Sequence, residues 1–126
     1  LQKHPNMTVV AINDLAEAAT LAHLLKYDSI HGTLDADVHS DGNDIVVNGK
    51  TIKALNCNHP KDIDWASHQV DVVVEATGKF KKEEQLQYHL KNGAKKVILS
   101  VPPEDESVKM VVLGVNEEII GADDHI

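Results

Sequence analysis

The chain has 126 residues, a length typical of one domain, and its 42% hydrophobic and 25% charged residues are ordinary for a globular protein. The net charge of −8, with basic residues adjacent only in pairs, argues against nucleic-acid binding, which needs Lys and Arg to neutralise phosphates. One cysteine, Cys57, excludes an internal disulfide, and no apolar run approaches the roughly 18 residues of a membrane span. The composition predicts a cytoplasmic protein with neither a nucleic-acid nor a membrane partner.

The first predicted elements are a strand and a helix that follow each other directly. Residues 7–12, MTVVAI, are short, apolar and β-branched, which predicts a buried strand. Asp14 can cap the following helix, with Glu17 three residues later as a capping-box partner. Apolar residues recur at helical spacing from Leu15 to Leu25, and the helix is predicted to end before Tyr27.

Residues 33–55 change to a period of two. Leu34, Ala36 and Val38 alternate with polar neighbours, and Asn48-Gly49 is a strong signal for a two-residue hairpin turn. This stretch predicts an antiparallel excursion of short strands.

The second half returns to alternating strands and helices. Strands are predicted over 70–76, 97–101 and 110–115, and a helix over 82–91 that Gly93 closes. Strand, helix and strand in succession, with continuously apolar strands, predict a doubly wound α/β fold whose parallel sheet is covered on both faces.

Small or polar residues end the predicted parallel strands, at Asn13-Asp14, Thr77-Gly78 and Ser100. In doubly wound sheets, ligands bind beyond the carboxyl ends of the strands. Gly78 lets a backbone approach a ligand closely. A binding site is therefore expected at this edge.

Asp14 has two interpretations. An acid at the end of the second strand is where a dinucleotide-binding fold holds the adenosine ribose hydroxyls; alternatively, Asp14 only caps the helix. The two roles are compatible, because each needs one oxygen. The phosphate-binding turn G-x-G-x-x-G should lie about 20 residues before such an acid. Only 13 residues precede Asp14 and none is glycine, so we expect the fold to lack its first strand and that turn.

The remaining candidates carry little chemistry. None of the eight histidines has metalloprotease spacing, and Cys57 has neither a zinc-site partner nor a local base, so no metal ligand and no catalytic residue is predicted. Phe80 either packs in the core or forms a wall of an adenine pocket.

Several segments together resemble one family. These are VVAINDL, LAHLLKYDSIHG, VNGK, VDVVVEATGKF, HLKNGAKKVILS and VLGVNEE. In this order they resemble the cofactor-binding domain of phosphorylating glyceraldehyde-3-phosphate dehydrogenases. The resemblance implies a partial Rossmann-type domain over residues 1–126 that binds NAD, in a tetrameric glycolytic enzyme acting on glyceraldehyde 3-phosphate and phosphate. The catalytic domain and its residues fall outside the resemblance, so this chain alone is expected to be inactive.

The resemblance also implies cofactor contacts. The resemblance places Asp14 on the adenosine ribose, and Asn58 and Phe80 beside the adenine. It places Thr77 and Gly78 against the cofactor and Ser100 toward the nicotinamide side. These residues are Asn13, Asp14, Asn58, Thr77, Gly78, Phe80 and Ser100. Two departures are Asn58, where arginine is common, and Val101, which makes the usual S-A-P into S-V-P.

Asp14 also predicts the form of the cofactor, since its charge would repel a 2′-phosphate and favour NAD over NADP. Two alternatives stay open: the sister erythrose-4-phosphate dehydrogenase, and a non-catalytic nucleotide-binding or interaction fragment. Without the central first strand, its two neighbours would each expose an unpaired edge, so we expect the isolated chain to be unstable or to swap strands.

Overall fold

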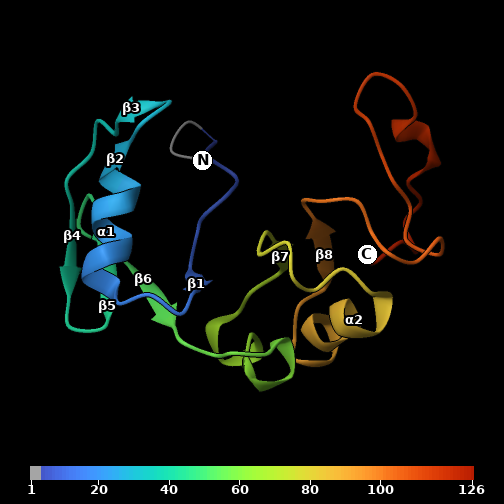
Figure 1. Ribbon diagram of the computed structural model, residues 1–126, viewed down its shortest axis with the longest axis horizontal. Coiled ribbons are helices and arrows are strands. Elements are labelled where there is room, and N and C mark those ends of the chain that lie inside the picture. Colours follow the sequence, from blue (N-terminus) through green and yellow to red (C-terminus); the bar gives the residue numbers. More distant parts are fainter. Residues whose placement is uncertain (1–3) are drawn as a thin grey trace. The chain divides into compact units, whose positions relative to one another are not determined.

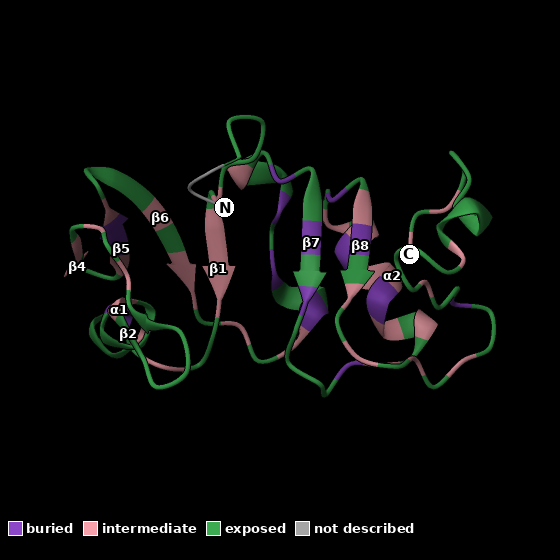
Figure 2. Cartoon of the chain, turned by 90° about the horizontal axis from the view of Figure 1, so that it is seen from above, coloured by how far each residue is buried: buried purple, intermediate pink, exposed green. Residues whose placement is uncertain are grey.

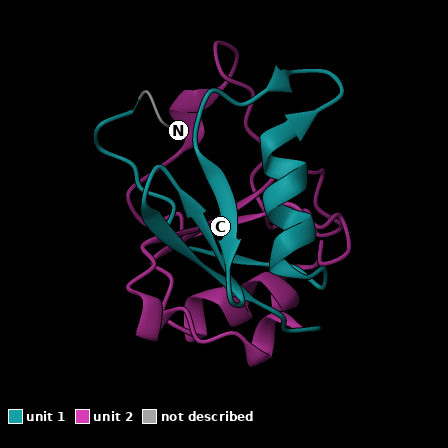
Figure 3. Ribbon diagram, turned by 90° about the vertical axis from the view of Figure 1, so that its left-hand side faces the viewer, with its two compact units in different colours: residues 1–58 teal, residues 59–126 magenta. Residues whose placement is uncertain are grey.

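The computed structural model describes residues 4–126, so Leu1–Lys3 of the predicted domain lie outside the described part. The chain divides into two compact units that meet in sequence at Asn58 and His59 (Figure 3). The first unit contains β1 (Ala11–Asn13), α1 (Ala18–Lys26), β2 (Tyr27–Asp28), β3 (Gly32–Thr33), β4 (Val38–Asp41), β5 (Asp44–Val47) and β6 (Lys50–Leu55). The second contains the 3₁₀ turns η1 (Pro60–Asp62), η2 (Ala66–His68) and η3 (Glu117–Ile119), with β7 (Val72–Glu75), α2 (Glu83–Lys91) and β8 (Lys96–Leu99).

The first unit is built on a four-stranded sheet in the order β1-β6-β5-β4, and α1 packs on β4 and β5 (Figure 1). β4, β5 and β6 pair antiparallel, which confirms the predicted excursion, whereas β1 pairs parallel with β6. Asn48 and Gly49 both have positive φ, 50° and 75°, as the mirror-image turn of a two-residue hairpin requires. Ile45 and Val46 of β5, together with Ala18 and Ala22 of α1, are buried.

The start of the chain differs from the prediction in two respects. β1 begins only at Ala11 and is half-buried, and Met7 and Val10 before it are exposed, because β6 is its only strand partner among the described residues. The helix begins at Ala18 rather than at Asp14, so the predicted Asp14 cap and capping box are wrong. Glu17 is the N-cap and makes no side-chain cap bond. The end of α1 at Lys26 agrees with the prediction.

The second unit contains a parallel pair of strands with α2 on one face. β7 and β8 align Val73 with Val97, and a core forms from Leu86 of α2 with Val97 and Val108. Burial alternates along β7 (Figure 2). The strands and helix predicted over 70–101 are therefore present.

The other face of this pair is open, which corrects the expectation of cover on both faces. Val72, Val74 and Ile98 are 48%, 60% and 56% exposed. Within the described part of this unit, α2 is the one α-helix, and it covers the opposite face.

The strand predicted over 110–115 does not form. Met110, Val112, Leu113 and Val115 are exposed, and polar side chains close the segment on itself. Asn116 accepts from the Val112 N–H at 2.6 Å and donates to the Met110 carbonyl at 3.0 Å. These local bonds take up backbone groups that a strand partner would otherwise satisfy.

No helix among residues 4–126 has the length and apolar character needed to cross a bilayer; α1 and α2 have nine residues each.

Gly93, directly after the α2 C-cap, lies tightly against η2. Its φ is +113°, and a Cβ there would lie 2.6 Å from the Ala66 Cβ and 2.7 Å from the Ala66 backbone. Ala66 cannot withdraw easily, because its N–H donates to the Asn92 carbonyl at 3.0 Å. Only glycine allows α2 and η2 to approach this closely.

We therefore predict that Gly93→Ala lowers the free energy of unfolding by about 3 kcal/mol, from backbone strain plus overlap. The loss of stability can be measured by unfolding the protein in urea while monitoring the fluorescence of Trp65. Trp65 is the only tryptophan and reports on this unit. The matched control is Gly114→Ala, with φ +80° but nothing within 4 Å of the added Cβ, and an expected cost of about 1 kcal/mol. Equal costs at the two positions would show that the contact with Ala66 contributes nothing.

Candidate functional site

Parallel pairing in the first unit gathers the ends of β1 and β6. Asn13 aligns with Leu55, and the Asp14 N–H donates to the Leu55 carbonyl at 3.1 Å, which continues the ladder past β1. This bond places Asp14 beside the loop that leads to Asn58.

Asn13 fixes that loop. Its side-chain oxygen accepts from the Cys57 N–H at 2.9 Å, and its amide nitrogen donates to the Cys57 carbonyl at 3.0 Å. The Asn13 side chain thus satisfies both backbone groups of Cys57 and holds the segment before Asn58 against the end of β1. Direct contact of Asn13 with a cofactor stays a prediction.

Asp14 uses one carboxylate oxygen locally. Its Oδ1 accepts from the Ala16 N–H at 2.9 Å, the turn that replaces the predicted helix cap. The side chain is exposed, and within residues 4–126 no hydrogen bond is found to Oδ2. One oxygen therefore remains as an acceptor for a diol, which fits the requirement of a ribose.

Parallel pairing in the second unit gathers a second set of predicted residues. Glu75 aligns with Leu99, and the Ser100 N–H donates to the Glu75 carbonyl at 3.0 Å. The Thr77-Gly78 turn therefore starts at the same edge as Ser100. Gly78 has φ +69° with nothing within 4 Å of the place a Cβ would take, so backbone conformation rather than crowding requires glycine.

A buried hydrogen-bonded chain of side chains supports this turn. The Trp65 indole N–H donates to His89 Nδ1 at 3.0 Å, and His89 Nε2 lies 3.1 Å from Glu75 Oε2. Glu75 Oε1 accepts from both the N–H and the hydroxyl of Thr77, at 2.8 and 2.6 Å. Sequence reasoning missed these residues. The available signal was Glu75 itself, an acid at the end of the apolar run VDVVV.

The charge of Glu75 is stabilised in place. Burial alone would raise the pKa of Glu75, but the hydrogen bonds from His89 and Thr77 outweigh it and hold that pKa below its ordinary value of 4.5. Glu75 and His89 are only 4% and 2% exposed. The carboxylate is thus a buried anion with specific donors.

Phe80 is buried, which agrees with core packing. Its ring meets the His59 ring edge-on with centroids 5.3 Å apart, and His59 meets Tyr88 in the same way at 5.6 Å. Contact of Phe80 with an adenine stays a prediction.

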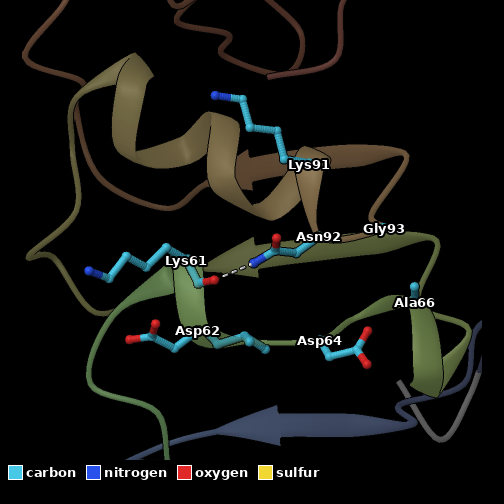
Figure 4. A pocket seen from close by; sticks show the side chains of 8 residues that line it. Lys61, Asp62, Asp64, Ala66, Lys91, Asn92 and Gly93 are labelled. Atoms are coloured by element: carbon cyan, nitrogen blue, oxygen red, sulfur yellow. Dashed lines mark hydrogen bonds between the residues drawn. The ribbon is translucent and has the colours of Figure 1, made fainter.

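A hollow of about 350 Å³ in the second unit lies away from these residues, between η1 and the end of α2 (Figure 4). In it the Asn92 amide donates to the Lys61 carbonyl at 3.0 Å. None of the seven predicted cofactor residues lines this hollow. Its walls include the tight approach of Gly93 to Ala66 described above.

Parallel strands whose carboxyl ends present an acid, a Thr-Gly turn and a serine define an α/β protein of the dinucleotide-binding class. The chain belongs to the glyceraldehyde-3-phosphate dehydrogenase family, because the family model "Glyceraldehyde 3-phosphate dehydrogenase, NAD binding domain" matches residues 1–83. The match confirms the resemblance, the fold class and NAD as the cofactor.

Curated relatives named glyceraldehyde-3-phosphate dehydrogenase agree with this assignment. The Geobacillus stearothermophilus protein is 52% identical over 116 residues, 92% of this chain and 34% of that protein. The Priestia megaterium protein is 51% identical over 123 residues, 98% of this chain and 36% of that protein. The Mycoplasma pneumoniae protein is 43% identical over all 126 residues, 37% of its length. The chain thus spans about a third of the relatives it matches.

We predict that acid removes the contribution of Glu75 to stability. Because its pKa is lowered in the folded state, that contribution is complete above the ordinary value of 4.5 and is lost as the pH falls through the folded value. Glu75→Gln should be less stable than wild type by about 2 kcal/mol at pH 7, and the difference should shrink as the pH falls below the ordinary value of 4.5. Urea unfolding at a series of pH values, followed by Trp65 fluorescence, measures this.

The matched control is Glu84→Gln, an exposed position in the first turn of α2, which should alter stability little at any pH. A difference between wild type and Glu75→Gln that does not shrink as the pH falls from 7 to well below the ordinary value of 4.5 would contradict the assignment.

Proposed function

We propose that this chain is the cofactor-holding part of a phosphorylating glyceraldehyde-3-phosphate dehydrogenase, and that Asp14 binds the adenosine ribose of NAD. The observation that carries the proposal is the carboxylate of Asp14, exposed at the end of β1 with one oxygen engaged by Ala16 and the other without a partner in the described chain. A ribose diol offers two hydroxyl donors to such an oxygen.

The second unit contributes its own contacts in this proposal. Thr77, Gly78 and Ser100 meet the cofactor from the ends of β7 and β8, and Phe80 borders the adenine. The parallel register of these strands and the positive φ of Gly78 support the assignment. This proposal also assigns Asn58 to the adenine; Asn58 follows Cys57, whose backbone the Asn13 side chain holds.

The proposed reaction of the whole protein is oxidation of glyceraldehyde 3-phosphate coupled to its phosphorylation by inorganic phosphate. Bound NAD supplies the acceptor for the hydride. In this proposal the chain positions the nucleotide and provides no catalytic group, so residues 1–126 alone are inactive. A glycolytic role, a cytoplasmic location and a tetrameric assembly belong to the same proposal.

Isothermal titration with NAD tests the role of Asp14 in a chimera in which this chain replaces the matching 116 residues of the Geobacillus stearothermophilus relative. Asp14→Asn keeps an oxygen for the Ala16 N–H but places an amide where the second carboxylate oxygen was. We expect it to weaken NAD binding by about tenfold, since a hydrogen bond to a charged group is lost. Asp14→Ala, which also removes the Ala16 bond, should weaken binding at least as much.

NADP serves as the comparison ligand for NAD, from which it differs by the 2′-phosphate. Wild type should bind NADP more weakly than NAD, because Asp14 repels the 2′-phosphate. Asp14→Asn should reduce this difference between the NAD and NADP affinities. If Asp14→Asn leaves the NAD affinity unchanged, Asp14 has no role in binding the ribose and serves only the local turn with Ala16.

The activity of the whole enzyme is tested by transplanting this chain. We predict that the Geobacillus stearothermophilus relative, with its matching 116 residues replaced by those of this chain, reduces NAD in a reaction that needs both glyceraldehyde 3-phosphate and phosphate. Asp14→Asn in the same chimera should raise the KM for NAD. A folded chimera that binds NAD but never reduces it would instead favour a non-catalytic nucleotide-binding role.

A further inference from the structure

We propose that His89 and Glu75, anchored by Trp65, are positioning residues that hold the Thr77-Gly78 turn in the conformation that meets NAD. The inference rests on the proposed function, because it assigns the turn to the nucleotide. The state of the turn can nevertheless be measured without nucleotide.

The hydrogen bond from Trp65 fixes the tautomer of His89. An indole N–H can only donate, so His89 Nδ1, 3.0 Å away, must accept and carries no proton. The imidazole proton then lies on Nε2, where it donates to Glu75 Oε2 at 3.1 Å. Trp65 thus determines which nitrogen of His89 faces the carboxylate.

Glu75 connects His89 to the Thr77-Gly78 turn through its two carboxylate oxygens. With Oε2 engaged by His89, Oε1 accepts both the N–H and the hydroxyl of Thr77. Thr77 Oγ1 in turn accepts from the Lys79 N–H at 3.1 Å. The Thr77 hydroxyl proton is therefore used within the protein, so the side chain can offer a ligand an acceptor but not a donor.

The network runs from the interior to the surface. Trp65, His89 and Glu75 are 5%, 2% and 4% exposed, and Thr77 and Gly78 are exposed. The three buried residues come from the η2 segment, α2 and β7, so three separate elements converge on one turn. Apolar residues of the same size would avoid the free-energy cost of desolvating a carboxylate, but they would make no hydrogen bonds to hold the Thr77-Gly78 turn in one conformation. The geometry thus ties a buried polar group to the conformation of a surface turn.

The test compares variants of this chain within the Geobacillus stearothermophilus chimera, by amide hydrogen exchange and by NAD titration, because the chain itself is expected to lack the phosphate-binding turn. His89→Leu removes both bonds of the imidazole, whereas His89→Gln restores a donor toward Glu75. We expect His89→Leu to speed exchange at Thr77 and Lys79 by about tenfold relative to the β7 amides, and to weaken NAD binding about tenfold. His89→Gln should keep both quantities within about threefold of wild type.

Leu86→Ala is the matched control for general destabilisation. Leu86 lies on the same helix, is 0% exposed and has no part in the hydrogen-bonded chain. It should lower stability while leaving the exchange of Thr77 relative to the β7 amides unchanged. If His89→Leu does not fold, Trp65→Phe decides the question. It frees Nδ1, so nitrogen NMR should show a mixture of His89 tautomers instead of the single form protonated at Nε2.

Each result has one meaning. Unchanged relative exchange at Thr77 in His89→Leu, or a wild-type His89 protonated at Nδ1, overturns the proposal. A loosened turn with unchanged NAD affinity overturns it too, but leaves the proposed function intact. A folded chimera without NAD affinity overturns both the proposed function and the nucleotide part of this inference, and Thr77 exchange still shows whether the turn is held.

Discussion

The buried carboxylate of Glu75 is the constraint around which the second unit is organised. A charge removed from water must be met by donors, and here they come from His89 on one oxygen and from Thr77 on the other. Trp65 satisfies the remaining ring nitrogen of His89. Because these partners lie on different elements, satisfying one charge fixes a helix, a strand end and a turn relative to one another.

Parallel pairing is the second organising feature, and it acts within each unit separately. A parallel ladder brings carboxyl ends to the same edge. Asp14 therefore lies beside the loop before Asn58, and the Thr77-Gly78 turn leaves β7 at the edge where Ser100 follows β8. In the first unit the Asn13 amide completes the arrangement by satisfying the backbone of Cys57. Both sets of predicted residues therefore depend on register, and a slip by one residue would separate them.

Sequence patterns succeeded where local chemistry decides the outcome. The Asn48-Gly49 turn is specified by two residues that tolerate positive φ, and α2 by its own periodicity, so both were predictable. Prediction failed where side-chain hydrogen bonds that the hydrophobic periodicity does not reveal decide the outcome. Asp14 is predicted to cap a helix, but its carboxylate accepts from the Ala16 N–H in a local turn, and the helix begins only at Ala18. The strand over 110–115 was lost to local bonds from Asn116. The link of Trp65 to Glu75 through His89 has no local pattern at all.

The single ladder that holds β1 has a consequence for how the first unit opens. β5 and β6 are joined by a two-residue turn, so closing them costs little chain entropy, whereas β1 reaches β6 across the whole of α1 and the hairpins. β6 is the template on which β1 is laid, and β4–β6 stay fully paired with one another when β1 is absent. Local unfolding of this unit therefore begins most cheaply at β1. The strand that leads directly into Asp14 is the one whose detachment disturbs its neighbours least.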